Sequence, residues 1–85
     1  MTNSREVILL NISGPDKPGI TTALTHILEQ YEVAILDIGQ AVIHDELSLG
    51  ILFEVSTENE SSSVLKDLLF RSYELGVNAK FTPIT

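Results

Sequence analysis

Two stretches of the sequence contain residues whose types and spacing could bind a small molecule. The first is NISGPDKPGI, residues 11–20, in which an apolar run ends and a helical pattern begins. Backbone N–H groups at the start of a helix bind carboxylates and phosphates, and Gly19 has no side chain to block the approach of such a group. On this hypothesis the amides of Gly19 and Ile20 form an anion cradle.

The same stretch also has a purely structural interpretation. Asp16 could cap the helix by accepting a hydrogen bond from the amide of Gly19. Pro18 would then occupy the first turn, where a missing N–H is tolerated, and Gly14 can adopt a positive φ as the chain leaves the strand. The stretch lacks the Lys-Ser/Thr pair of a phosphate-binding Walker loop. From the residues alone, this stretch can therefore be either a structural turn or an anion-binding site.

The second stretch is AILDIGQ, residues 34–40, where Asp37 interrupts an apolar strand pattern. A buried carboxylate without partners is unfavourable, so Asp37 is either solvated at an exposed edge or positioned for a ligand. In the second case Asp37 or Gln40 would bind an ammonium group, and Gly39 would allow close approach.

Other chemistry finds little support in the sequence. The chain has no cysteine, which excludes disulfides and fits a reducing, cytoplasmic location. His26 and His44 lack the neighbours of a metal site, and no arrangement of nucleophile, base and acid is apparent. A net charge of −7 with scattered basic residues argues against nucleic-acid binding. We expect neither a signal peptide nor a membrane helix.

The apolar pattern predicts six elements. Strands are expected at residues 6–13, 33–44, 47–56 and 77–84, with a tight turn at Asp45-Glu46. Helices are expected at residues 18–31 and at about 62–75, with Asn59 or a neighbouring serine as the second N-cap and Gly76 as the residue that ends that helix. The helix stripes that should face the sheet are Ile20, Ala23, Leu24, Ile27, Leu28 and Tyr31, and Val64, Leu65, Leu68, Leu69, Ser72 and Leu75.

The order β-α-β-β-α-β is that of a ferredoxin-like fold, of the α+β class, with a four-stranded antiparallel sheet and two helices on one face. Residues 6–13 and 47–56 should be the central strands. Either Leu9 or its neighbours Ile8, Leu10 and Ile12 then lie on the uncovered face. In the second strand, Ile35 and the pair Leu36 and Ile38 are expected on opposite faces. An apolar second face predicts a partner, either another copy or another domain.

The segment ILLNISGPDKPGITTALTHIL resembles the opening of an ACT domain, in which a strand, a D-x-P-G turn and an amphipathic helix begin the same six-element unit. Asp16, Pro18 and Gly19 match that turn. The segment VAILDIGQAVIHDELSLGILFEV is similar to the N-terminal regulatory segment of bacterial phosphoserine phosphatases. The resemblance covers nearly the whole chain.

This resemblance implies a regulatory domain that binds an amino acid, with serine expected, and that pairs with another ACT copy. The ligand would contact Gly14, Asp16, Pro18, Gly19 and Ile20, with Asp37 and Gln40 as the weaker candidates. Residues 1–85 would form a single domain without a cofactor, excised from a longer chain whose Mg²⁺-dependent catalytic domain follows residue 85.

Three alternatives remain. Within the same family, the chain could be the ACT module of a formyltetrahydrofolate deformylase or a glycine-cleavage regulator. Two hypotheses belong to other classes: a structural oligomerisation module without a ligand, and a small hydrolase. A small hydrolase of this fold would need an arginine in the anion cradle, and only Lys17 is there. We therefore expect no catalytic activity from these residues.

Overall fold

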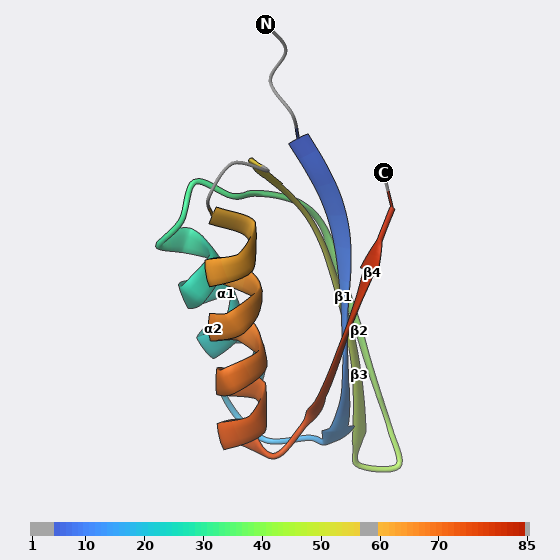
Figure 1. Cartoon of the computed structure of the whole chain (residues 1–85). Helices are drawn as coiled ribbons and strands as arrows, with labels where there is room; N and C mark the ends of the chain where they lie inside the picture. The colour runs from blue at the N-terminus through green and yellow to red at the C-terminus, as the bar shows by residue number, and fades with distance from the viewer. Residues whose placement is uncertain (1–4, 57–59, 85) are drawn as a thin grey trace, which may run out of the picture.

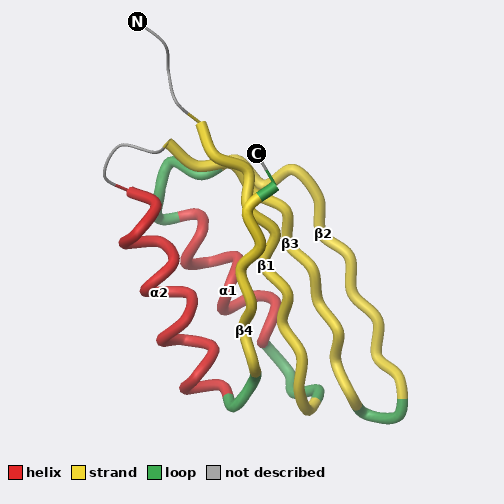
Figure 2. Tube along the Cα trace, turned by 45° about the vertical axis from the view of Figure 1, so that its right-hand side comes forward, coloured by secondary structure: helices red, strands yellow, loops and turns green. Residues whose placement is uncertain are grey.

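The computed structural model of the chain describes residues 5–56 and 60–84. Its elements are β1 (Arg5–Pro15), α1 (Ile20–Glu29), β2 (Ala34–Ile43), β3 (Glu46–Ser56), α2 (Glu60–Leu75) and β4 (Asn78–Pro83). The strands form one antiparallel sheet in the order β2-β3-β1-β4. Both helices cover the same face of this sheet (Figures 1 and 2). The predicted ferredoxin-like fold is therefore confirmed, including its two central strands.

The hydrophobic core lies between this sheet and the two helices. Alternate residues of the central strands point into it, because successive side chains of a strand project to opposite faces. The buried apolar side chains of β1 and β3 are Ile8, Leu10, Ile12, Leu47, Leu49, Ile51, Phe53 and Val55. Leu9 lies opposite Leu52 on the face without helices. Of the two alternatives that the sequence left open for β1, Leu9 is therefore the residue on the uncovered face, and its neighbours Ile8, Leu10 and Ile12 are in the core.

The helical stripes are confirmed with one exception. Ile20, Leu24 and Leu28 of α1 are buried, as are Val64, Leu68 and Ser72 of α2. The hydroxyl of Ser72 is satisfied inside the core, because it donates a hydrogen bond to the carbonyl oxygen of Leu68 at 2.7 Å. Leu69 was expected to face the sheet, but 52% of its surface is exposed. Leu69 lies at the side of the buried stripe and lines a groove together with Val77 and Ala79.

The hairpin between β2 and β3 turns one residue earlier than predicted. Its turn residues are His44 and Asp45, with φ angles of 51° and 65°, and Glu46 already belongs to β3. Two consecutive residues with positive φ form the type of turn that matches the twist of an antiparallel hairpin. The predicted Asp45-Glu46 turn is therefore wrong by one position.

The predicted faces of β2 are also wrong in one respect. A register shift between Ile35 and Asp37 pairs Ile35 with Phe53 and Ile38 with Ile51, so that both lie on the helix side of the sheet. A bulge adds one residue to a strand, and the faces of all later residues are exchanged. Every residue of β2 is nevertheless exposed, because β2 is an edge strand that the helices do not cover.

The end of α2 follows the prediction, whereas its start differs. Gly76 has a φ of 76°; its amide donates to the carbonyl of Tyr73, and the amide of Val77 donates to that of Ser72. This pair of bonds is the Schellman motif, which favours glycine at the left-handed position. The helix begins at Glu60 rather than near residue 62. The predicted cap at Asn59 lies outside the described residues.

No helix in the described parts of the chain is long and apolar enough to cross a membrane.

Candidate functional site

The turn between β1 and α1 is built differently from the predicted cap. α1 begins at Ile20, its N-cap is Gly19 with a φ of 87°, and no side chain caps the helix. Asp16 is therefore not the cap; its backbone amide donates to the carbonyl of Asp45 at 2.9 Å and continues the β1–β3 ladder. Pro18 precedes the N-cap instead of lying in the first helical turn. The prediction failed because a left-handed glycine can start the helix without a capping side chain.

Gly14 has a packing function in this turn. Its φ is 153°, and a Cβ atom there would lie 3.0 Å from Cγ1 and 3.2 Å from Cα of Val77. A side chain is thus excluded by the start of β4 as well as by the backbone conformation. Gly14 stays within β1, opposite Leu47, so it allows close packing instead of ending the strand.

A small pocket of about 210 Å³ lies where this turn approaches β2. Its lining consists of Asp16, Lys17, Gly19, Ile20, Thr21, Thr22, Gln40 and Leu47. Four residues proposed from the sequence thus meet here: Asp16, Gly19, Ile20 and Gln40. Pockets for drug-sized molecules have volumes of about 300–1,000 Å³. This one therefore suits a smaller ligand.

The polar groups of the pocket complement a zwitterion. The first N–H groups of a helix have no partner within the helix, and the helix dipole gives that end a positive potential. The amides that follow Gly19 therefore form the side of the pocket that attracts a carboxylate. Asp16, which carries a negative charge, is another residue of the same lining. A cation and an anion of one small molecule can be bound together in this space.

Two lining residues from different elements are joined by a hydrogen bond. The Thr21 hydroxyl on α1 donates to Oε1 of Gln40 on β2 at 2.7 Å. Because this bond uses only Oε1, the Nε2 group of Gln40 is left as a donor. Thr21 lies outside the apolar stripe of the helix, and the sequence assigned it no function. The signal that could have found it is its position two residues after the helix-initiating glycine.

Lys17 is a second residue that the sequence did not assign to the site. Its ammonium group donates to the carbonyl oxygen of Leu75 at 3.1 Å, at the C-terminal end of α2. That end of a helix carries a partial negative charge, which favours a cation. Lys17 therefore links the ligand turn to the end of the second helix.

Asp37 does not belong to this pocket. It is paired with Leu52 in the sheet and lines a shallow depression of about 200 Å³ on the face without helices, together with Leu9, Gly39, Gly50 and Leu52. Gln40 is paired with Leu49, whose side chain is in the core. Asp37 and Gln40 consequently lie on opposite faces of the sheet, and one ligand cannot use both.

The described residues contain no group of three or more His, Cys, Asp or Glu side chains that could hold a metal ion. Nε2 of His26 lies 3.2 Å from Nε2 of Gln30. His44 lies in the hairpin turn.

A comparison with known families matches residues 6–82 to the ACT domain. Among curated proteins, the chain is 35% identical over 60 residues to the phosphoserine phosphatase SerB2 of Mycobacterium tuberculosis; the match covers 71% of this chain and 15% of the phosphatase. It is 32% identical over 73 residues to a UPF0237 protein of Methanococcus maripaludis, covering 85% of this chain and 81% of that protein. The chain therefore belongs to the ACT domain family.

Among solved structures, the chain resembles a candidate glycine cleavage system transcriptional repressor. The TM-score is 0.86 with 20% identity, and the match covers 95% of this chain and 47% of the other. At this identity the likeness extends to the fold alone. The chain thus spans less than half of this protein and a small part of the phosphatase, but most of the archaeal relative.

Proposed function

We propose that this ACT domain is a regulatory sensor of a free amino acid, and that serine is its ligand. The observation that carries the proposal is the meeting of an uncapped helix N-terminus, the Asp16 carboxylate and the Gln40 amide around one small pocket. The sequence identity with a phosphoserine phosphatase supports serine as the ligand, because serine is what remains when phosphoserine loses its phosphate.

The binding mode follows from the charges of the lining. The ligand carboxylate accepts hydrogen bonds from the amides at Gly19 to Thr21, and Nε2 of Gln40 donates a further one. The ligand ammonium group binds the Asp16 carboxylate. A pocket of this volume favours a short side chain, and the hydroxyls of Thr21 and Thr22 can pair with the hydroxyl of serine. No cofactor is needed in this domain.

A second copy of the domain is proposed to complete the site along β2. The ten residues of this edge strand are all exposed, and several are large and apolar: Ile35, Leu36, Ile38, Val42 and Ile43. Unpaired, flat and apolar edges associate readily with other strands. Because Gln40 belongs to this edge and also lines the pocket, pairing through β2 would connect ligand binding with assembly. Such linkage is what a regulatory domain requires.

We further propose that the domain belongs to a phosphoserine phosphatase, whose separate catalytic domain would use Mg²⁺. The second candidate is a structural module that pairs subunits without a ligand. The exposed β2 edge favours pairing in either case, so only ligand binding separates the two candidates.

The deciding experiment is a thermal-shift titration of the chain with L-serine and with other amino acids. A ligand that binds only the folded state stabilises it by RT ln(1 + [L]/Kd), and a millimolar site is visible at tens of millimolar ligand. We expect a shift with L-serine that is lost in Asp16→Asn and kept in Asp37→Asn, the same chemical change outside the pocket. No shift with any amino acid would favour the structural module, and equal loss of the shift in both variants would contradict the assignment of the ligand to this pocket.

A further inference from the structure

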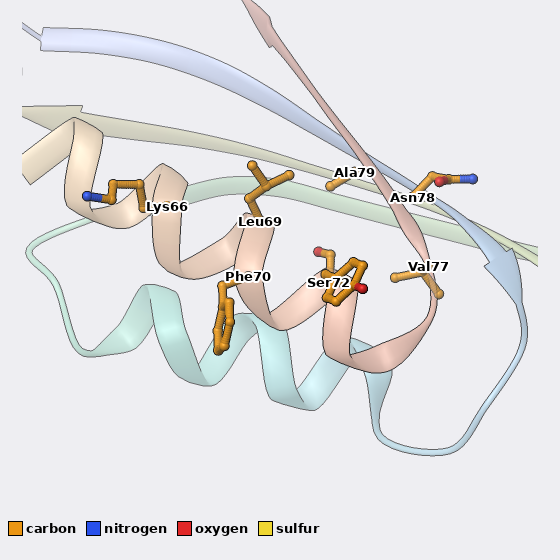
Figure 3. A pocket seen from close by; sticks show the side chains of 8 residues that line it. Lys66, Leu69, Phe70, Ser72, Val77, Asn78 and Ala79 are labelled. Atoms are coloured by element: carbon orange, nitrogen blue, oxygen red, sulfur yellow. The ribbon is translucent and has the colours of Figure 1, made fainter.

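A groove away from the proposed ligand pocket lies between α2 and the outer strand β4. It has a volume of about 560 Å³ and is lined by Lys66, Leu69, Phe70, Ser72, Tyr73, Val77, Asn78 and Ala79. In Figure 3, Leu69 points from α2 toward β4, where Ala79 lies beside it. Leu69, Phe70 and Tyr73 are 52%, 65% and 82% exposed. The groove is thus apolar, and Lys66 is its one charged lining residue.

The outer edge of β4 runs along this groove and offers backbone hydrogen bonds. The amide of Ile84 donates to the carbonyl of Val7, and the β1–β4 register pairs Thr82 with Leu9 and Lys80 with Asn11. Hydrogen-bonded pairs alternate along an antiparallel ladder. The N–H and C=O groups of Lys80 and Thr82 therefore point to β1, whereas those of Ala79 and Phe81 point outward. A further strand can form four backbone bonds at these two residues.

The positive charges that are not already engaged lie on this edge. Arg5 pairs with Glu54 and Arg71 with Glu74, and Lys17 bonds the carbonyl of Leu75. Among the residues that the structure describes, Lys66 and Lys80 are the two basic side chains without such a partner. Lys66 lines the groove on the helix side of the sheet, and Lys80 is paired with Asn11 on the other face. In a chain with a net charge of −7, this edge is locally basic.

A second copy of the chain fits this edge poorly. Pairing of two β4 strands that uses both Ala79 and Phe81 places Lys80 directly opposite Lys80 of the other copy, and like charges at such positions are destabilising. Shifting the register by one pair in one direction places Phe81 opposite Phe81 of the other copy and Ala79 opposite Pro83, which has no N–H to donate, so a backbone bond is lost at each end. Shifting it in the other direction opposes Phe81 with Val77, which precedes the strand and is buried. Charge and register therefore disfavour self-pairing at β4.

We propose that the α2–β4 groove is a docking site for an extended, acidic segment of another protein, which adds to the sheet as a fifth strand. In this mode of recognition the backbone bonds supply affinity and alternate side chains supply specificity. Side chains opposite Ala79 and Phe81 enter the groove and are apolar. The side chain between them faces Lys80 and is acidic, as are the next ones on that face.

The first test uses a labelled peptide with this alternation, SEVEFES, and the control peptide SKVKFKS, with binding followed by fluorescence anisotropy. We expect the acidic peptide to bind at least about tenfold more tightly than the basic one at low salt. Lys80→Glu should weaken its binding about fivefold or more, since a favourable charge contact becomes a repulsion. Arg71→Glu is the control, because it makes the same charge change outside both the groove and β4, and it should leave binding nearly unchanged.

The second test is amide hydrogen exchange with and without the acidic peptide. Exchange at Ala79 and Phe81 should slow on binding, whereas the amides of Lys80 and Thr82, already bonded to β1, should change little. Equal binding of both peptides, loss of binding in Arg71→Glu alone, or protection on β2 instead of β4 would overturn the proposal. Protection of Ala79 and Phe81 that rises with protein concentration alone would overturn it in favour of a second copy.

Discussion

The hydroxyl of Thr21 on α1 and the side-chain amide of Gln40 on β2 are joined by a 2.7 Å hydrogen bond. This bond closes one side of the proposed ligand pocket by connecting the first helix to the edge strand. Thr21→Val keeps the shape of the side chain and removes the donor. We expect a loss of about 1 kcal/mol or less in the free energy of unfolding, because the bond is exposed, and a severalfold loss of L-serine affinity.

Isothermal titration and urea unfolding would measure both effects. Thr25→Val is the control, since the Thr25 hydroxyl bonds only to carbonyls of its own helix, those of Thr21 and Thr22. If Thr25→Val weakened serine binding as much as Thr21→Val, the pocket would not depend on the α1–β2 connection.

Gly14 is expected to be the glycine of the ligand turn that tolerates substitution least. Gly14→Ala places a Cβ against both the side chain and the backbone of Val77 in a φ region that L-residues rarely adopt. Overpacking and backbone strain together should lower the free energy of unfolding by about 2–4 kcal/mol. Gly39→Ala meets no atom within 4 Å and should change it by about 0.5 kcal/mol or less. Similar melting temperatures for the two variants would contradict this account.

Lys17 should stabilise the end of α2 electrostatically. Lys17→Met retains most of the aliphatic stem but removes the ammonium group that bonds the Leu75 carbonyl. We expect a loss of about 0.3–1 kcal/mol at low salt, which becomes smaller as salt screens the helix dipole. Urea unfolding at two salt concentrations would measure it. Lys66→Met is the control, because Lys66 is on α2 but far from its C-terminal end. An equal, salt-dependent loss of stability in Lys66→Met would contradict the role of Lys17 at that end.

The β2 edge is expected to mediate self-association. Ile38 is 42% exposed. Backbone hydrogen bonds alternate along the β1–β3 and β2–β3 ladders, and in this register the N–H and C=O groups of Ile38 point outward, away from β3. Ile38→Lys should weaken dimerisation by about tenfold or more, because a charged residue on an edge strand opposes strand pairing. Sedimentation equilibrium would measure the change. Leu69→Lys, on the α2–β4 groove, should leave the dimer intact; if it were the variant that dissociates, the two edges would have exchanged roles.

Local sequence determined much of this protein. Helical and strand periods, the Schellman glycine Gly76 and the D-x-P-G turn predicted the six elements, the central strands and the core, because these features depend on residues close together in the chain. Four residues proposed from the sequence line one pocket, and their binding of a ligand stays a prediction. Errors occurred where a left-handed conformation replaced the expected one, as at Gly19, or where a bulge in β2 exchanged the faces of the strand.

Only the tertiary structure decided which of the proposed site residues meet. The pairing of β2 with β3 decided that Gln40 lies on the helix face and Asp37 on the other, and Gln40 reaches the turn because β2 lies beside α1. Lys17 and Leu75 are far apart in sequence and become neighbours when the second helix packs on the sheet. Such contacts depend on sheet order and helix packing. The preferences of single residues for helix, strand or turn do not predict these contacts, because the contacts form only when the helices pack on the sheet.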